Sequence, residues 1–285
     1  MESGLRGVSS AVLRAVADRL ELPTDHQLIA YRTLSRYGPV VDACVLEIGG
    51  AQHCKSIRPF IDAGATTGVV TGLDHISYDQ TTAGEKITIL RADALRLSQA
   101  FGPSEFDFVY GLSVVEHIRE PAAFLAEIFK VLRPSGLAYF EGGPIWTAPD
   151  GHHLWVATWG GAYHSRATAN YLFAPYPGYT SSNPLEDWAH LLMEPVEMKE
   201  YLVTKALPEI DIACIIDWVY SNHEINRLSL AALAATYGNC DLQVLETITT
   251  RVKVPRSIRC KLWDRYGAGV DYGVRTVAYV LRKPT

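Results

Sequence analysis

The chain has 285 residues, 48% of them hydrophobic, and its 31 acidic against 26 basic side chains give a net charge of −5. A chain of this length and hydrophobicity can bury a large core without covalent staples, which excludes a disordered or fibrous protein. The acidic balance and the lack of a long Lys/Arg run argue against nucleic acid or an anionic membrane as the main partner. We therefore expect a small-molecule partner; a homo-oligomer is compatible with the sequence.

The five cysteines are scattered along the chain and form no CxxC pair, which indicates a reducing compartment. The first 20 residues interleave charged and apolar side chains at helical spacing, unlike a signal peptide. No apolar run approaches the roughly 18 residues that a bilayer span requires. These features predict a cytoplasmic protein without a membrane partner.

Two helices are expected at the start of the chain, near residues 10–20 and 25–37, within an N-terminal helical segment that covers residues 1–40. From Ala43 onward, short apolar runs alternate with amphipathic stretches. In chain order the runs are ACVLEI, TGVVTGL, KITIL, FDFVYGL and GLAYFEG. This alternation predicts an α/β fold with a mostly parallel sheet that helices cover on both faces.

The clearest predicted helix begins at Pro121 and ends before the bend Arg133–Gly136. After it the composition changes, because residues 144–190 hold nine aromatic side chains in 47 positions and only four charged ones. Such a segment is typical of a lid over a ligand. We expect an inserted cap segment at residues 144–209 that contacts the substrate.

The C-terminal part returns to the alternating pattern. A helix is expected over residues 224–237, followed by β-rich stretches at residues 242–254 and 274–281. The two stretches predict an antiparallel pair at the end of the sheet, joined by a polar loop.

The most informative string is the end of the first apolar run, where Glu47 precedes a glycine-rich turn. In an open α/β sheet, ligands bind beyond the carboxyl ends of the strands. A dinucleotide site needs glycines at relative positions one, three and six, which here are Gly49, Ala51 and Cys54. A carboxylate two residues before the first glycine suits an ammonium group better than a pyrophosphate.

This string resembles the first motif of the class I S-adenosylmethionine (SAM)-dependent methyltransferases, Glu/Asp-x-Gly-x-Gly-x-Gly. Glu47 and Gly49 match it, whereas Ala51 and His53 replace the second and third glycines. Further similar strings follow in the family's order: Gly72-Leu73-Asp74, Arg91-Ala92-Asp93-Ala94, Phe106–Val109 through Glu116-His117, and Leu132–Gly136. The resemblance implies one domain over residues 1–285 with SAM as cofactor. It also implies a Rossmann-like, seven-stranded, mostly parallel sheet with an antiparallel last strand.

Cofactor residues follow from the resemblance. It places Glu47 near the amino-acid part of SAM, Asp74 on the ribose hydroxyls and Asp93 near the adenine. The complete expected set is Glu47, Gly49, Gly50, Ala51, Asp74, His75, Asp93, Ala94 and Ser113. Structural alternatives stay open for the three acids: a solvated strand end for Glu47, a turn acid for Asp74 and a helix cap for Asp93.

Candidate catalytic residues are the histidines, since imidazole is the commonest general base near neutral pH. His152 and His153 lie in the cap segment, and His117 follows the fourth strand. Adjacent histidines diverge in extended chain, so at most one of the pair is expected to face the substrate. A packed, hydrogen-bonded histidine is the alternative for each.

The expected substrate pocket is lined by Trp146, Trp155 and Trp159. We expect no metal, since Asp150, His152, His164 and His190 lack a recurring ligand spacing. Near the N-terminus, His26 and Tyr31 on the second predicted helix are expected to close over bound SAM.

These features predict a SAM-dependent methyltransferase that acts on a small organic acceptor, on oxygen, in natural-product or sugar tailoring. N-methylation is one alternative. A methyltransferase-fold binding protein without catalysis is another, raised by the two missing glycines. The missing third glycine disfavours a nicotinamide-dependent oxidoreductase.

Overall fold

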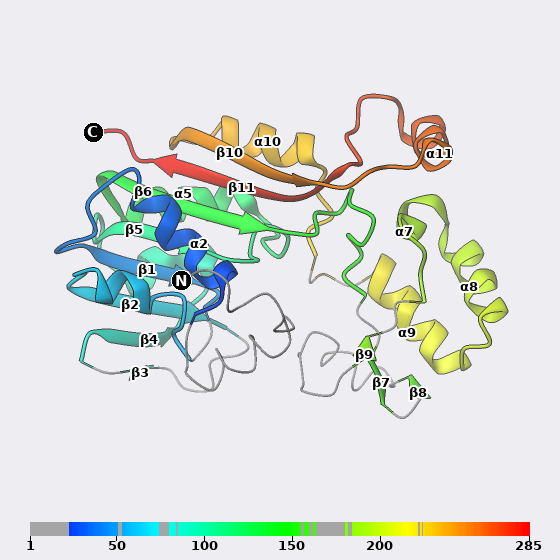
Figure 1. Ribbon diagram of the computed structural model, residues 1–285, viewed down its shortest axis with the longest axis horizontal. Coiled ribbons are helices and arrows are strands. Elements are labelled where there is room, and N and C mark those ends of the chain that lie inside the picture. Colours follow the sequence, from blue (N-terminus) through cyan, green and yellow to red (C-terminus); the bar gives the residue numbers. More distant parts are fainter. Residues whose placement is uncertain are drawn as a thin grey trace, which may run out of the picture.

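The computed structural model describes residues 23–50, 53–73, 80–83, 85–154, 157–159, 162–163, 180–181, 184–221, 223 and 225–285. Its main sheet is formed by β1 (Cys44–Ile48), β2 (Thr67–Gly72), β3 (Gln80–Thr82), β4 (Ile87–Arg91), β5 (Phe106–Gly111), β6 (Leu132–Gly142), β10 (Gln243–Arg251) and β11 (Val274–Arg282). The strand order is β10-β11-β6-β5-β1-β2-β4-β3 (Figure 1).

The seven-stranded Rossmann-like sheet expected from the sequence is confirmed. β1 pairs in parallel with β2 and β5, and the last strand, β11, runs antiparallel to both β6 and β10. The eighth strand, β3, is a three-residue edge strand antiparallel to β4. Its sequence, Gln-Thr-Thr, has no apolar run, which is why the sequence pattern did not predict it.

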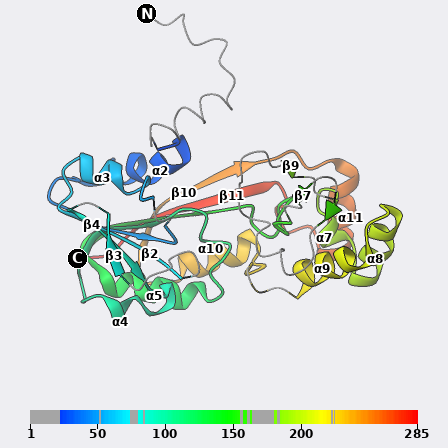
Figure 2. The same cartoon turned by 90° about the horizontal axis from the view of Figure 1, so that it is seen from below.

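Helices cover both faces of this sheet (Figure 2). One face carries α2 (Asp25–Leu34) and α3 (Arg58–Asp62), and the other carries α4 (Leu97–Ala100), α5 (Pro121–Val131) and α10 (Leu230–Gly238). Alternate strand residues feed the two cores: Val45 packs on the α2–α3 side and Leu46 on the α5–α10 side. α2 begins at a Thr24–Gln27 capping box. The helix expected near residues 10–20 lies outside the described residues.

Two C-terminal expectations need correction. The helix expected over residues 224–237 begins only at Leu230, where Ser229 caps it by accepting a hydrogen bond from Ala232 N–H. The connection between β10 and β11 is not a loop, because it contains α11 (Arg256–Tyr266). Only Leu262 of α11 is buried, so the helix lacks the apolar periodicity that sequence reasoning uses.

Between β6 and α10 the chain forms a second group of elements beyond the carboxyl end of β6 (Figure 1). Its described residues include a small sheet of order β8-β7-β9 and the helices α7, α8 and α9. The bounds are β7 (Ala157–Trp159), β8 (Ala162–Tyr163), β9 (Thr180–Ser181), α7 (Ala189–Leu192), α8 (Pro195–Thr204) and α9 (Glu209–Tyr220). Residue 209, the expected end of the cap segment, is the first residue of α9. The buried sides of α8 and α9 pack together around Met198, Leu202 and Ile215.

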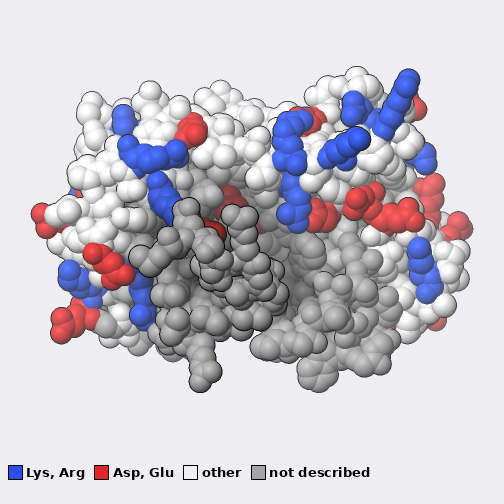
Figure 3. Space-filling view, viewed as in Figure 1, with Lys and Arg blue, Asp and Glu red and all other residues white. Residues whose placement is uncertain are grey.

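Charged side chains of both signs are interspersed over the described surface in Figure 3. Within the described residues, the structure has no helix that is both long and apolar enough to cross a membrane.

A partly buried ion pair between Asp150 and Arg275 attaches the start of the cap segment to β11. The Arg275 Nη2 donates to Asp150 Oδ2 at 2.7 Å, and Nε lies 3.2 Å from both carboxylate oxygens. The Asp150 side chain is 18% exposed and that of Arg275 40%. This two-pronged geometry holds residues 144–150 against the sheet.

We expect Asp150→Asn to lower the free energy of unfolding by about 1 kcal/mol, because the charge-assisted pair is only partly screened by solvent. Asp25→Asn is the matched control, since its pair with Arg32 is 92% exposed on the aspartate side. The control should cost less than about 0.5 kcal/mol. Urea unfolding measures both, and equal losses in the two variants would contradict the assigned role.

Candidate functional site

The turn after β1 is built around two glycines. Gly49 has a φ of +71°, in the left-handed region that favours glycine. Gly50 donates its N–H to Thr71 O at 3.0 Å, which joins the ends of β1 and β2. A Cβ on Gly50 would lie 2.6 Å from the carboxyl carbon of Glu47, so only glycine fits against that side chain.

Glu47 is 3% exposed and lies beneath this turn. Ser56 Oγ donates to its Oε1 at 2.5 Å, and Tyr110 Oη donates to Oε2 at 2.9 Å. Burial nevertheless raises the pKa of Glu47 to about 7. The carboxyl group thus ties β1, β5 and the segment before α3 together. A direct contact with SAM stays a prediction.

Leu73 and Asp93 follow β2 and β4 at the same strand edge, and the contact of Asp93 with adenine stays a prediction. Leu73, directly after β2, is a large apolar side chain left 41% exposed. Asp93, after β4, has a side chain 39% exposed, and its Oδ1 accepts from Leu95 N–H at 2.9 Å, so it caps the short 3₁₀ helix that starts at Ala94. An exposed apolar contact and a carboxylate suit the face and the amino group of adenine. Asp93 therefore has the predicted cap role, and its Oδ2 lies 4.0 Å from Arg96 Nε.

Three expected cofactor residues, Ala51, Asp74 and His75, lie outside the described residues. The last expected cofactor residue, Ser113, is exposed directly after β5 and has a φ of +54°. A non-glycine residue in this conformation is uncommon and occurs preferentially at functional sites. Gly49 and Ser113 follow the neighbouring strands β1 and β5, and Leu73 and Asp93 follow β2 and β4, so all four lie at one edge of the sheet.

The turn after β5 places a buried acid beside an exposed histidine. Glu116 is 2% exposed, and its Oε2 has no hydrogen-bond partner among the described residues. Burial raises the pKa of Glu116 to about 7. The His117 side chain is 39% exposed, with Nε2 3.9 Å from Glu116 Oε1. Asn226 clamps this turn, because its Nδ2 donates to Val115 O and Ile118 O at 2.6 and 2.9 Å.

The histidines of the cap segment diverge, as expected. His153 packs edge-on against His117, with ring centroids 5.5 Å apart, and its Nε2 lies 2.6 Å from Pro144 O. His152 turns the other way, against His190 at 5.1 Å, and its Nδ1 accepts from Leu154 N–H. Burial lowers the pKa of His153 to about 4 and that of His152 well below its usual value. Two of the three candidate bases, His117 and His153, therefore lie together, and His152 does not join them.

Sequence reasoning missed Glu141, an acid on β6, the strand beside β5. Glu141, near the end of β6, lies 3.0 Å from His26 Nε2, and this hydrogen bond raises the pKa of His26. His26 on α2 thus reaches the carboxyl edge of the sheet, where it was expected to close over SAM. Nothing in the local sequence marks Glu141 or Asn226, because their partners are more than 100 residues away.

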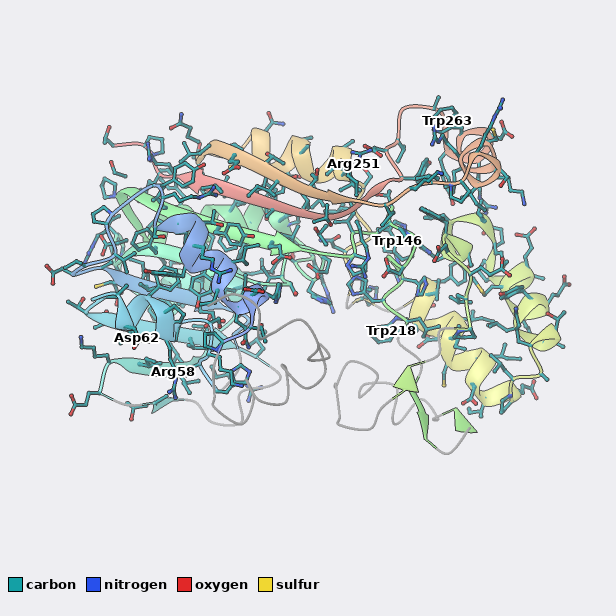
Figure 4. The ribbon with its side chains drawn as sticks, in the orientation of Figure 1. Arg58, Asp62, Trp146, Trp218, Arg251 and Trp263 are labelled. Carbon is teal, nitrogen blue, oxygen red and sulfur yellow. The ribbon has the colours of Figure 1, made fainter. Side chains whose placement is uncertain are left out.

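Trp146 lies at the junction of the strand ends and the helices α7–α9, above Trp218 in Figure 4. Its ring is 4.6 Å from that of His190 on one side, and the Arg227 guanidinium is 5.3 Å from its centroid. Trp155 lies outside the described residues, and Trp159 is described only as the last residue of β7. A pocket wall of these three tryptophans stays a prediction.

Comparisons with known proteins agree with this geometry. Residues 48–140 match a family model described as a methyltransferase domain. A structure from Listeria monocytogenes, assigned as a SAM-dependent methyltransferase, has 12% identity and a TM-score of 0.50 and covers 91% of this chain and 99% of its own. A SAM-dependent methyltransferase from Mesorhizobium loti has 13% identity and a TM-score of 0.48, covering 89% and 96%. At 12% identity the likeness to the Listeria monocytogenes structure concerns the fold alone, and a search of curated proteins gave no match.

The raised pKa of Glu47 makes stability depend on pH. Between pH 4.5 and about 7 the folded chain holds a proton that the unfolded chain has released, so the free energy of unfolding falls as pH rises. Glu47→Gln imitates the protonated acid. Relative to this variant, we expect the wild type to lose up to about 3 kcal/mol between pH 5 and pH 8.

Urea unfolding at several pH values measures this difference. Glu200→Gln, the same change at an exposed site on α8, is the control. A difference between wild type and Glu47→Gln that is constant from pH 5 to pH 8 would show that Glu47 is not the buried acid described.

Proposed function

We propose that this chain is a SAM-dependent methyltransferase that methylates a small organic acceptor on oxygen, and the match of residues 48–140 to a methyltransferase-domain model supports the general activity. The observation that carries this proposal is His117, half-exposed beside buried Glu116 and His153 at the carboxyl end of β5. A hydroxyl acceptor must lose a proton, and this cluster places imidazole and carboxylate groups where the acceptor arrives.

SAM, when bound, supplies a methyl group on a sulfonium, which is already a good electrophile. The chain must then position two ligands and exclude water. Gly49, Leu73, Asp93 and Ser113 follow neighbouring strands at one sheet edge and are proposed to hold the cofactor together with Asp74. Glu47 keeps the first turn in shape from beneath it, through Ser56 and Tyr110.

We assign the acceptor to the side of the cluster that faces the cap segment, residues 144–209, within a single domain over residues 1–285. The aromatic composition of this segment favours a flat or apolar small molecule, as in natural-product or sugar tailoring, over a nucleic acid. A cytoplasmic location and a homo-oligomer are compatible with this proposal.

The test is transfer of labelled methyl from SAM to a panel of phenols, sugar hydroxyls and the amines that match them in shape. Mass spectrometry of the products locates the methyl group. Methylated oxygen supports the proposal. Transfer to the amines alone would assign N-methylation instead.

Asp74→Ala should weaken SAM binding roughly 10- to 100-fold, because a carboxylate hydrogen bond to ribose hydroxyls contributes about 1.5–3 kcal/mol. Calorimetry measures the dissociation constant. Asp62→Ala, at an exposed acid on α3, is the control and should bind SAM as the wild type does. Unchanged affinity in Asp74→Ala would refute the assignment of the ribose site.

His117→Asn should lower kcat by about 10²- to 10⁴-fold, the usual contribution of a positioned acid–base group, while SAM affinity is kept. His223→Asn, at an exposed histidine, is the matched control. Turnover near that of the wild type in His117→Asn would remove His117 from the reaction.

A further inference from the structure

Three potential metal ligands converge at the carboxyl ends of β5 and β6. One ligand atom each from Glu116, His117 and His153 lies within 4.8 Å of the other two. We propose that these side chains bind a divalent transition-metal ion. Two of them come from one turn and the third comes from the cap segment 36 residues later, so no local spacing marks the site.

His153 is prepared as a ligand by its surroundings. Its Nε2 lies 2.6 Å from Pro144 O, and only a protonated nitrogen can donate to that carbonyl. The neutral ring therefore carries its lone pair on Nδ1, on the other side from Pro144. Metal-binding histidines are oriented in this way by a hydrogen bond from their second nitrogen.

Glu116 supplies a buried carboxylate, whose Oε1 lies 3.9 Å from His117 Nε2. Its Oε2 is buried without a hydrogen-bond partner in the part of the chain that the structure describes, an arrangement that costs free energy unless a cation or proton is present. Gly142 on β6 leaves room for this atom, because a Cβ at that position would overlap it. Asn226 holds the backbone on both sides of Glu116, which fixes the position from which the carboxylate extends.

His117 opens the cluster to solvent. Its side chain is 39% exposed, whereas Glu116 and His153 are 2% and 4% exposed. An ion can enter from this side, and the same side leaves coordination positions for water or for another ligand. Three protein ligands with open positions are typical of sites that bind a substrate, whereas structural sites are closed by four.

The donor set decides the class of ion. Two imidazole nitrogens and one carboxylate oxygen suit Zn²⁺, Fe²⁺ or Co²⁺, whereas Mg²⁺ and Ca²⁺ prefer oxygen ligands alone. Its consequence for catalysis rests on the proposed function: a His117 ring bound to the ion cannot accept a proton, so the ion would activate an acceptor oxygen in place of that base. Ion binding itself does not depend on that proposal.

The test is titration of the metal-depleted full chain with Co²⁺, followed by visible absorption. We expect one equivalent to bind with the d–d bands of nitrogen and oxygen ligation, with Zn²⁺ displacing it and Mg²⁺ not. His117→Asn should weaken binding at least 10-fold. His223→Asn, which replaces an exposed histidine outside the cluster, should bind Co²⁺ as the wild type does.

Glu116→Gln and His153→Asn are the second pair of variants, and urea unfolding establishes that each is folded before titration. Loss of the bands in these and in His117→Asn, with retention in His223→Asn, supports the site. Absence of a one-equivalent spectrum in the wild type, or an unchanged spectrum in His117→Asn, overturns it. Oxygen methylation by metal-depleted protein would leave the proposed function intact and remove only the ion's part in it.

Discussion

Two glutamates are buried at the ends of neighbouring parallel strands, and the free-energy cost of burying their charge shapes the turns around them. Glu47 and Glu116 are 3% and 2% exposed, and burial raises the pKa of both to about 7. A buried carboxylate must be protonated, hydrogen-bonded or paired with a cation. Glu47 uses two hydroxyl donors, whereas one oxygen of Glu116 has no described donor. The first acid therefore acts on the fold, and the second remains available for chemistry.

Each acid depends on a glycine that passes close to it. Gly50 lies against the carboxyl carbon of Glu47, and Gly142 lies against the carboxylate of Glu116. A side chain at either position would overlap the acid or push it away. The two glycines thus have no Cβ for a steric reason that is distinct from the positive φ of Gly49. The departure from the usual glycine spacing at Ala51 leaves these contacts intact.

Sequence reasoning recovered the sheet because each central strand is a short, mostly apolar run, and that signal is local. The sequence argument that His152 and His153 diverge assumed an extended chain, whereas the structure places them in a turn in which His153 has a φ of +52°. Sequence reasoning missed α11, whose single buried residue gives no periodicity. It placed Glu116 and His117 beside a strand but could not join them to His153 or Asn226, since those contacts depend on how the chain returns after the cap segment. No metal was expected for the same reason: ligand spacing along the chain does not reveal a site assembled from distant segments.

The attachment of the cap segment to the sheet connects these observations. Asp150 is fixed to β11 by Arg275, and His153, three residues later, contacts both Pro144 and the His117 ring. The turn that bears His117 is in turn fixed by Asn226, which lies just before α10. Both sides of the cluster are therefore held by regular elements of the main sheet and its helices. A cluster supported in this way keeps its geometry when other parts of the cap segment change, because none of these supporting contacts depends on them.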